Sequence, residues 1–110
     1  NTKYREGAQK TILGLRAKLG MKLYEVGVLY IKLRAFDSAI IAFENMLDNF
    51  YDTPYTGLAH VGIIRCHSEM LEVEKAQKYL ELKKDILNVE LQTEAERYIA
   101  KAYKRIEKAK

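Results

Sequence analysis

The residues best suited to chemistry are two histidines and the single cysteine. His60 and His67 are seven residues apart, and Cys66 directly precedes the second histidine. On a helix, seven residues span about 10 Å along the axis, so the two imidazoles cannot share one metal ion unaided. Zinc sites in proteins usually need four ligands with closely spaced pairs. The spacing therefore favours packing or groove-lining roles for these side chains, and we expect neither a metal nor another cofactor.

Other catalytic patterns are scarce. The sequence has no glycine-rich phosphate loop, no G-x-S-x-G motif and no Cys/His/Asx set at a strand-to-helix turn. The acidic pairs Glu72/Glu74 and Glu94/Glu96 fall at expected helix starts, where the helix dipole stabilises negative charge. We therefore expect a protein that is not an enzyme and has no small-molecule substrate, although a role as an enzyme's accessory domain stays open.

The elements that position these side chains are indicated by a helical-repeat motif. The tetratricopeptide-repeat consensus reads W-x2-L-G-x2-Y and later A-x3-F. Small residues are needed where two antiparallel helices cross closely, so Gly27 is expected to face Ala39. The motif predicts tetratricopeptide-repeat-like helical hairpins that stack as an α-solenoid. It is carried by Leu23, Val26, Gly27, Tyr30, Ala39 and Phe43.

Hydrophobic periodicity predicts an all-α fold of about five helices with a long first helix. The expected helices span about residues 3–34, 37–50, 54–71, 73–87 and 93–110. The first is expected to be continuous because its apolar stripe stays in phase across Gly14 and Gly20. The stripe predicted to face the core comprises Tyr4, Ala8, Ile12, Leu15, Leu19, Leu23, Val26, Tyr30 and Leu33.

Two local signals set the expected helix starts. Thr53 is placed to cap the third helix, with Pro54 at the first helical position, where its missing N–H costs nothing. The T-x-x-E pattern from Thr93 to Glu96 is typical of a capping box and predicts the start of the last helix. That helix is expected to close the open end of the stack, as terminal repeats do.

A second, degenerate repeat is predicted at an offset of 37 residues. Ala76 then corresponds to Ala39, and Leu80 corresponds to Phe43. The first half of this second copy departs from the consensus, because its four positions are occupied by His60, Ile63, Ile64 and His67.

Length and composition predict one domain. With 110 residues, of which 48% are hydrophobic, the chain can bury one modest core, and we expect a single helical domain over residues 1–110. There is no run of eighteen apolar residues that would predict a membrane span. The lack of an initiator methionine and of a signal peptide indicates a fragment of a longer chain.

The net charge of +4 conceals three alternating blocks. Residues 1–34 carry +6, residues 35–74 carry −6 and residues 75–110 carry +4. The simplest interpretation is that neighbouring helices attract one another. A nucleic-acid-binding protein more often keeps one continuous basic stripe with interleaved aromatic residues, so we expect no nucleic-acid partner. A helical nucleic-acid-binding domain nevertheless remains an alternative, since the sequence pI is about 9.1.

A candidate binding groove is predicted beside the core stripe of the first helix. Its apolar residues recur at steps of three, four and three, although a solvated groove is normally polar, and such a patch usually marks a contact site. The alternative is that they pack against the third helix or against upstream repeats. The candidate protein-binding residues are Met21, Tyr24, Val28, Ile31 and Arg65.

The order of these motifs over roughly residues 1–87 resembles the C-terminal repeats of the BamD family of outer-membrane assembly lipoproteins. That family shows a Pro-Asn-Ser-x-Tyr turn before a long helix, a Tyr-x-x-A-x-x-Y-Y motif within it, and a Y-P-D-T-P sequence after the next helix. Tyr51 departs from the usual proline of the last motif, and residues 88–110 match only a generic terminal helix. The matching residues are Thr2, Tyr4, Tyr24, Gly27, Tyr30, Asp52, Thr53 and Pro54.

The resemblance implies a non-enzymatic scaffold in the periplasm, associated with the outer membrane. The lipid-bearing N-terminal cysteine of such a protein would lie outside this chain, and Cys66 cannot replace it because it falls in mid-helix. The implied partner is the set of periplasmic domains of a BamA-like barrel subunit. A second interpretation within this class is another periplasmic repeat adaptor, similar to the coordinator of the Tol–Pal system.

Overall fold

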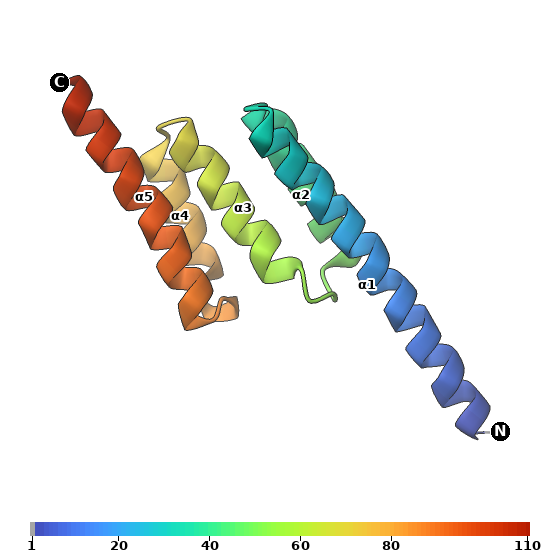
Figure 1. The fold of residues 1–110 in the computed structure, drawn as a ribbon. Coiled ribbons are helices and arrows are strands. Elements are labelled where there is room, and N and C mark those ends of the chain that lie inside the picture. The colour runs from blue at the N-terminus through green and yellow to red at the C-terminus, as the bar shows by residue number, and fades with distance from the viewer. Residues whose placement is uncertain (1) are drawn as a thin grey trace.

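A computed structural model describes residues 2–110, which form five α-helices and no strand (Figure 1). The expected all-α class and the expected number of helices are confirmed. The long first helix is unbroken across Gly14 and Gly20, as its periodicity predicts. The helices are α1 (Thr2–Lys32), α2 (Phe36–Phe50), α3 (Thr56–Glu69), α4 (Val73–Lys83) and α5 (Val89–Ala109), with a single 3-10 turn at Lys84–Ile86.

The helices are arranged in two layers. Helices α1, α3 and α5 run in the same direction, while α2 and α4 return behind them (Figure 1). The N-terminal half of α1 projects beyond the other helices, which contributes to an elongated molecule of 67 × 28 × 17 Å. The side chains of residues 2–15 are accordingly all exposed. Helices α3, α4 and α5 lie on one side of the α1–α2 pair, and the other side of the pair is exposed (Figure 1).

The turns after α1 and α3 have the same backbone geometry, 37 residues apart. Arg34 has φ 59° and Leu71 has φ 61°, a left-handed conformation that residues other than glycine adopt infrequently. In both turns, the next residue donates its N–H to a carbonyl five residues earlier, Ala35 to Tyr30 at 2.9 Å and Glu72 to His67 at 2.8 Å. This is the Schellman arrangement for ending a helix. The predicted 37-residue offset therefore holds for the backbone of the two turns.

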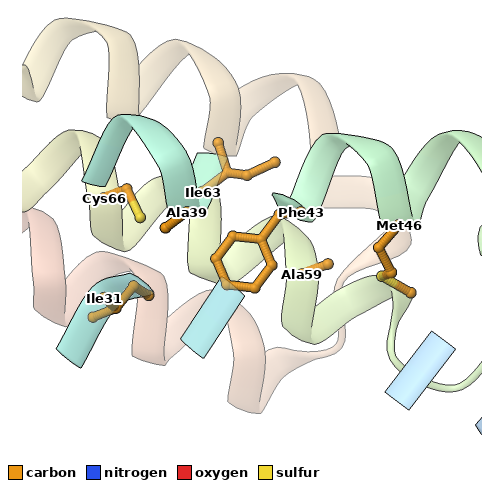
Figure 2. Close-up of a cluster of buried hydrophobic side chains, with 7 residues drawn as sticks. All are labelled: Ile31, Ala39, Phe43, Met46, Ala59, Ile63 and Cys66. Atoms are coloured by element: carbon orange, nitrogen blue, oxygen red, sulfur yellow. The ribbon is translucent and has the colours of Figure 1, made fainter. Parts of the chain in front are cut away.

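The main core lies where α1, α2 and α3 meet, with the ring of Phe43 in its middle (Figure 2). A Cβ atom built on Gly27 would lie 2.6 Å from Cζ of this ring, and one built on Gly62 would lie 2.7 Å from the same atom. The tip of the ring is thus held between two glycines, on α1 and on α3. The buried members of this cluster are Ile31, Ala39, Phe43, Met46, Ala59, Ile63 and Cys66.

The structure corrects the predicted partner of Gly27. Ala39 is fully buried, as expected, but the three atoms nearest to a Cβ at Gly27 all belong to Phe43. The close approach of α1 and α2 therefore serves to admit the aromatic ring. Tyr30 does not fill the space beside the crossing, because 36% of it is exposed.

The predicted core face of α1 is wrong for most of its length. Leu19 is 50% exposed, Val26 is 41% exposed and Leu33 is 65% exposed, whereas only Leu23 of the stripe packs against the core. Both faces of this stretch are apolar, so periodicity alone cannot select between them. Helix α2 packs on the face that carries Gly27, and the loop after it packs on Gly20, because small residues permit a close approach. The remaining exposed members of the predicted stripe are Tyr4, Ala8, Ile12, Leu15 and Tyr30.

Two helix starts also differ from the expected positions. Helix α3 begins at Thr56 without a side-chain cap, and the hydroxyl of Thr53 instead donates to the carbonyl of Phe50 at 2.9 Å. Helix α5 begins before Thr93, because Asn88 caps it by accepting a hydrogen bond from the N–H of Leu91 at 2.8 Å. Asparagine is a favoured cap, and Thr93 lies inside the helix, where its hydroxyl donates to the carbonyl of Val89 at 2.8 Å.

Ion pairs link the alternating charge blocks. The Arg16 guanidinium lies 2.7 Å from an Asp52 carboxylate oxygen, which joins α1 to the loop after α2. On α3, the Glu69 carboxylate is 4.0 Å from Arg34 and 3.6 Å from Arg105 of α5. These pairs agree with the interpretation that neighbouring helices attract one another. They are partly exposed, so their contribution to stability is small.

Candidate functional site

Four of the five predicted groove residues line one narrow cleft between α1, α3 and α5. Tyr24, Val28 and Ile31 come from α1, and Arg65 comes from α3. The cleft has a volume of about 40 Å³, little more than the share of one liquid water molecule. Met21 does not line it, and the prediction for this residue is not supported by the geometry.

The apolar side of the cleft is continuous with the core. The ring of Tyr24 lies 5.8 Å from that of Phe43 and 6.0 Å from that of Tyr55, measured between centroids. Ile31 is 8% exposed and belongs to the buried cluster. Both residues therefore have packing roles, which was the alternative to a contact role. Burial also raises the pKa of Tyr24.

The polar side of the cleft is formed by Arg65 together with two residues of α5. The guanidinium of Arg65 lies over the ring of Tyr98, 5.1 Å from its centroid, and the Tyr98 hydroxyl donates to the Glu94 carboxylate at 3.1 Å. The Nε atom of Arg65 is buried and has no hydrogen-bond partner among residues 2–110. Buried polar groups are normally paired, so an acceptor for this N–H has to come from outside the described residues, either as water or as part of a partner.

Glu94 and Tyr98 were not predicted as site residues. Their spacing of four residues puts them on one face of α5. This pairing of an acid with an aromatic residue one turn later was the signal in the sequence that could have identified them. Which helix this face meets depends on the packing of α5 against α3, which no local pattern reports. Burial raises the pKa of Tyr98, and the hydrogen bond to Glu94 acts in the same direction.

The two histidines and the cysteine do not converge. Nδ1 of His60 lies 2.7 Å from the hydroxyl oxygen of Tyr79, while Nδ1 of His67 lies 3.1 Å from a carboxylate oxygen of Glu72. Cys66 is fully buried in the main core, and burial raises the pKa of its thiol to about 12. Within the described part of the chain, no three His, Cys, Asp or Glu side chains gather in a way that could hold a metal ion.

His60 predicts a pH-dependent stability. Burial, helped by the Lys83 ammonium, lowers the pKa of His60 to about 4, against about 6.5 in an unfolded chain. Between these values the unfolded chain binds a proton that the folded chain does not, so stability falls as the pH drops from 6.5 to 4. The expected loss is up to about 3 kcal/mol at ~1.4 kcal/mol per pKa unit. Urea unfolding between pH 4 and 7.5 measures it.

Two variants separate the effect of burying His60 on the pH dependence from the effect of its hydrogen bond. His60→Gln is expected to remove this part of the pH dependence, because no imidazole remains to be protonated. Tyr79→Phe is expected to keep most of it, since it removes the hydrogen bond but leaves the imidazole buried. The same slope in wild type and in His60→Gln would assign the acid sensitivity to other groups.

No known family, curated protein or solved structure was found to match this chain. Among residues 2–110, none of the helices is both long enough and apolar enough to span a membrane.

Proposed function

We propose that this chain is a non-enzymatic protein-interaction scaffold built from stacked, tetratricopeptide-repeat-like helical pairs. The repeat interpretation is supported by the matching turns at Arg34 and Leu71 and by the equivalent burial of Ala39 and Ala76. The narrow cleft between α1, α3 and α5 is the proposed docking site. In this proposal, Tyr24, Val28 and Ile31 form its fixed apolar wall.

The observation that carries this proposal is the unpaired, buried Nε of Arg65. Leaving a buried donor without an acceptor typically costs ~1–3 kcal/mol. A partner that supplies a carboxylate or a carbonyl oxygen removes that cost on binding. Because the closed cleft admits little more than one water molecule, Arg65 and Tyr98 must move aside as the partner enters. Only their side chains are in contact, so Arg65 and Tyr98 can separate without a change in the main chain.

The partner we propose is the set of periplasmic domains of a BamA-like barrel subunit, following the resemblance to the BamD family. The corresponding location is the bacterial periplasm, associated with the outer membrane. This assignment depends on the motifs around Tyr24, Gly27 and Thr53. A periplasmic adaptor of the Tol–Pal type would use the same cleft with a different partner.

Arg65→Met is expected to weaken binding to purified BamA-like periplasmic domains by about tenfold or more, because a charge-assisted hydrogen bond is worth ~1.5–3 kcal/mol. Methionine keeps the apolar stem, so the melting temperature should stay within a few degrees of wild type. Titration calorimetry and thermal unfolding measure the two quantities. This single substitution is preferable to replacing Ile31, which is buried in the core.

Lys101→Met is the matched control, because it removes one positive charge from an exposed position of α5 outside the cleft. It should bind as wild type does. Equal losses in both variants would indicate general electrostatic attraction and contradict the cleft. Failure of the wild-type chain to bind would contradict the BamA-like partner. Salt-sensitive binding to generic duplex DNA would instead favour the nucleic-acid alternative.

A further inference from the structure

A larger cavity opens between α2 and α4, separate from the proposed docking cleft. Its volume is about 610 Å³, within the range of roughly 300–1,000 Å³ that is common for ligand sites. Side chains of α2 form one wall, side chains of α4 form the other, and α3 contributes Thr56 and His60. None of its lining residues belongs to the predicted groove.

The α2 wall carries two carboxylates without partners. Glu44 and Asp48 are four residues apart, both are exposed, and neither forms an ion pair or a side-chain hydrogen bond with any residue from 2 to 110. Like charges at this spacing repel each other, and the wall therefore attracts a cation. Burial raises the pKa of Tyr79, which also lines the cavity, and the Glu44 carboxylate acts in the same direction.

A buried histidine with one free ring nitrogen lies beside this wall. His60 is 6% exposed, and its Nδ1 is engaged with the hydroxyl of Tyr79. Its second nitrogen, Nε2, has no hydrogen-bond partner within the described residues. In the tautomer with the proton on Nδ1, the ring donates to Tyr79 and Nε2 is an acceptor. Because burial lowers the pKa of His60 to about 4, the ring adds no positive charge at neutral pH.

The remaining walls are largely apolar and aromatic. Tyr51 is 71% exposed and Ile86 is 61% exposed, so each offers uncovered apolar surface, and Leu47 lies between the two acids in sequence. The cation among the lining residues is Lys83, whose Nζ lies 5.9 Å from the centroid of the Tyr79 ring. Two negative charges against one positive charge leave the cavity with a net charge of −1.

We propose that this cavity binds an organic cation, an alkylammonium or guanidinium group on an apolar stem. The charged group lies against Glu44 and Asp48 and donates to Nε2 of His60. The stem lies along Leu47, Tyr51 and Ile86. Two sources carry this chemistry: the side chain of a lysine or arginine on a protein partner, and a free amine.

The proposal is tested by NMR titration of the whole chain at low salt with two probes, N-acetyl-L-arginine amide and agmatine. Both are expected to shift the backbone amides of Thr56, His60 and Tyr79 in a saturable manner. Agmatine carries two positive charges and the capped arginine one, so equal or tighter binding of the capped arginine supports a protein side chain as the source. Agmatine binding that is tighter by clearly more than the roughly fivefold effect of one extra charge pair supports a free amine. Absence of saturable shifts at these amides with both probes overturns the site.

Charge variants give the sharper test. The double variant Glu44→Gln with Asp48→Asn is expected to weaken both probes by about tenfold or more, since each exposed pair near 4 Å contributes ~1 kcal/mol, or about fivefold. The control, Glu6→Gln with Glu25→Gln, removes the same charge from exposed positions of α1 and should leave the affinity unchanged. Lys83→Gln should strengthen binding severalfold. Weaker binding of these cations to Lys83→Gln would show that the Lys83 ammonium does not repel them from the cavity and would overturn the proposal.

Discussion

Phe43→Ala is expected to lower the free energy of unfolding by about 3–5 kcal/mol, the usual cost of removing a fully buried phenylalanine. The ring is 0% exposed and is the side chain around which α1, α2 and α3 pack (Figure 2). Its tip is enclosed by Gly27 and Gly62, which have no side chains that could collapse into the space. Because small domains are stable by only ~5–15 kcal/mol, this one change removes a large share of the total.

Urea unfolding at neutral pH measures the effect. Ile41→Ala is the matched control, because Ile41 lies two residues earlier on α2 and is 58% exposed. Its removal should cost less than about 1 kcal/mol, in keeping with an exposed position. A loss below that value for Phe43→Ala would show that the three helices do not depend on the ring for their packing.

The sequence predicted the helices well because their signals are local. Apolar periodicity extends without interruption across Gly14 and Gly20, and α1 is continuous. Ala39 and Ala76, which were expected to occupy equivalent positions, are both fully buried. The continuity of α1 depends on residues within a few turns of one another, which one sequence reports directly.

The orientation of α1 could not be predicted in the same way. Its central part is apolar on both faces, so a stripe through Val26 and a stripe through Tyr24 satisfy the periodicity equally. The contact with α2 selects between them, because only the side that carries Gly27 admits the Phe43 ring. The start of α5 was missed for a different reason. Two capping signals lie five residues apart, and only the geometry shows that Asn88 makes the hydrogen bond.

The cleft was partly predicted because three of its residues lie close together on one helix. Tyr24, Val28 and Ile31 share one face of α1, and helical spacing is sufficient to group them. Arg65 lines the same cleft, but its partners Glu94 and Tyr98 come from a helix about 30 residues away in sequence. The Nε atom of Arg65 is unpaired because other parts of the chain bury it without supplying an acceptor. No pattern in the sequence reports such burial.

Gly27→Leu is expected to lower the free energy of unfolding by about 1–3 kcal/mol, the typical cost of overpacking a core. The added Cβ would lie 2.6 Å from Cζ of Phe43, closer than carbon atoms can approach without strain, and the ring cannot retreat because Gly62 lies on its other side. Helix propensity opposes the loss, since leucine favours a helix over glycine by somewhat less than 1 kcal/mol. Chemical denaturation measures the sum of the two effects.

Two further variants separate steric strain from helix propensity. Gly14→Leu places the same side chain on the same helix where nothing lies within 4 Å of the new Cβ, so it should stabilise the protein by several tenths of a kcal/mol or more. Combining Gly27→Leu with Phe43→Leu removes the ring that the new side chain meets. The double variant should therefore lose less stability than the two single losses added together, as coupled neighbours do. Strict additivity, or a Gly27→Leu midpoint equal to that of wild type, would show that α1 and α2 are not held together through this ring.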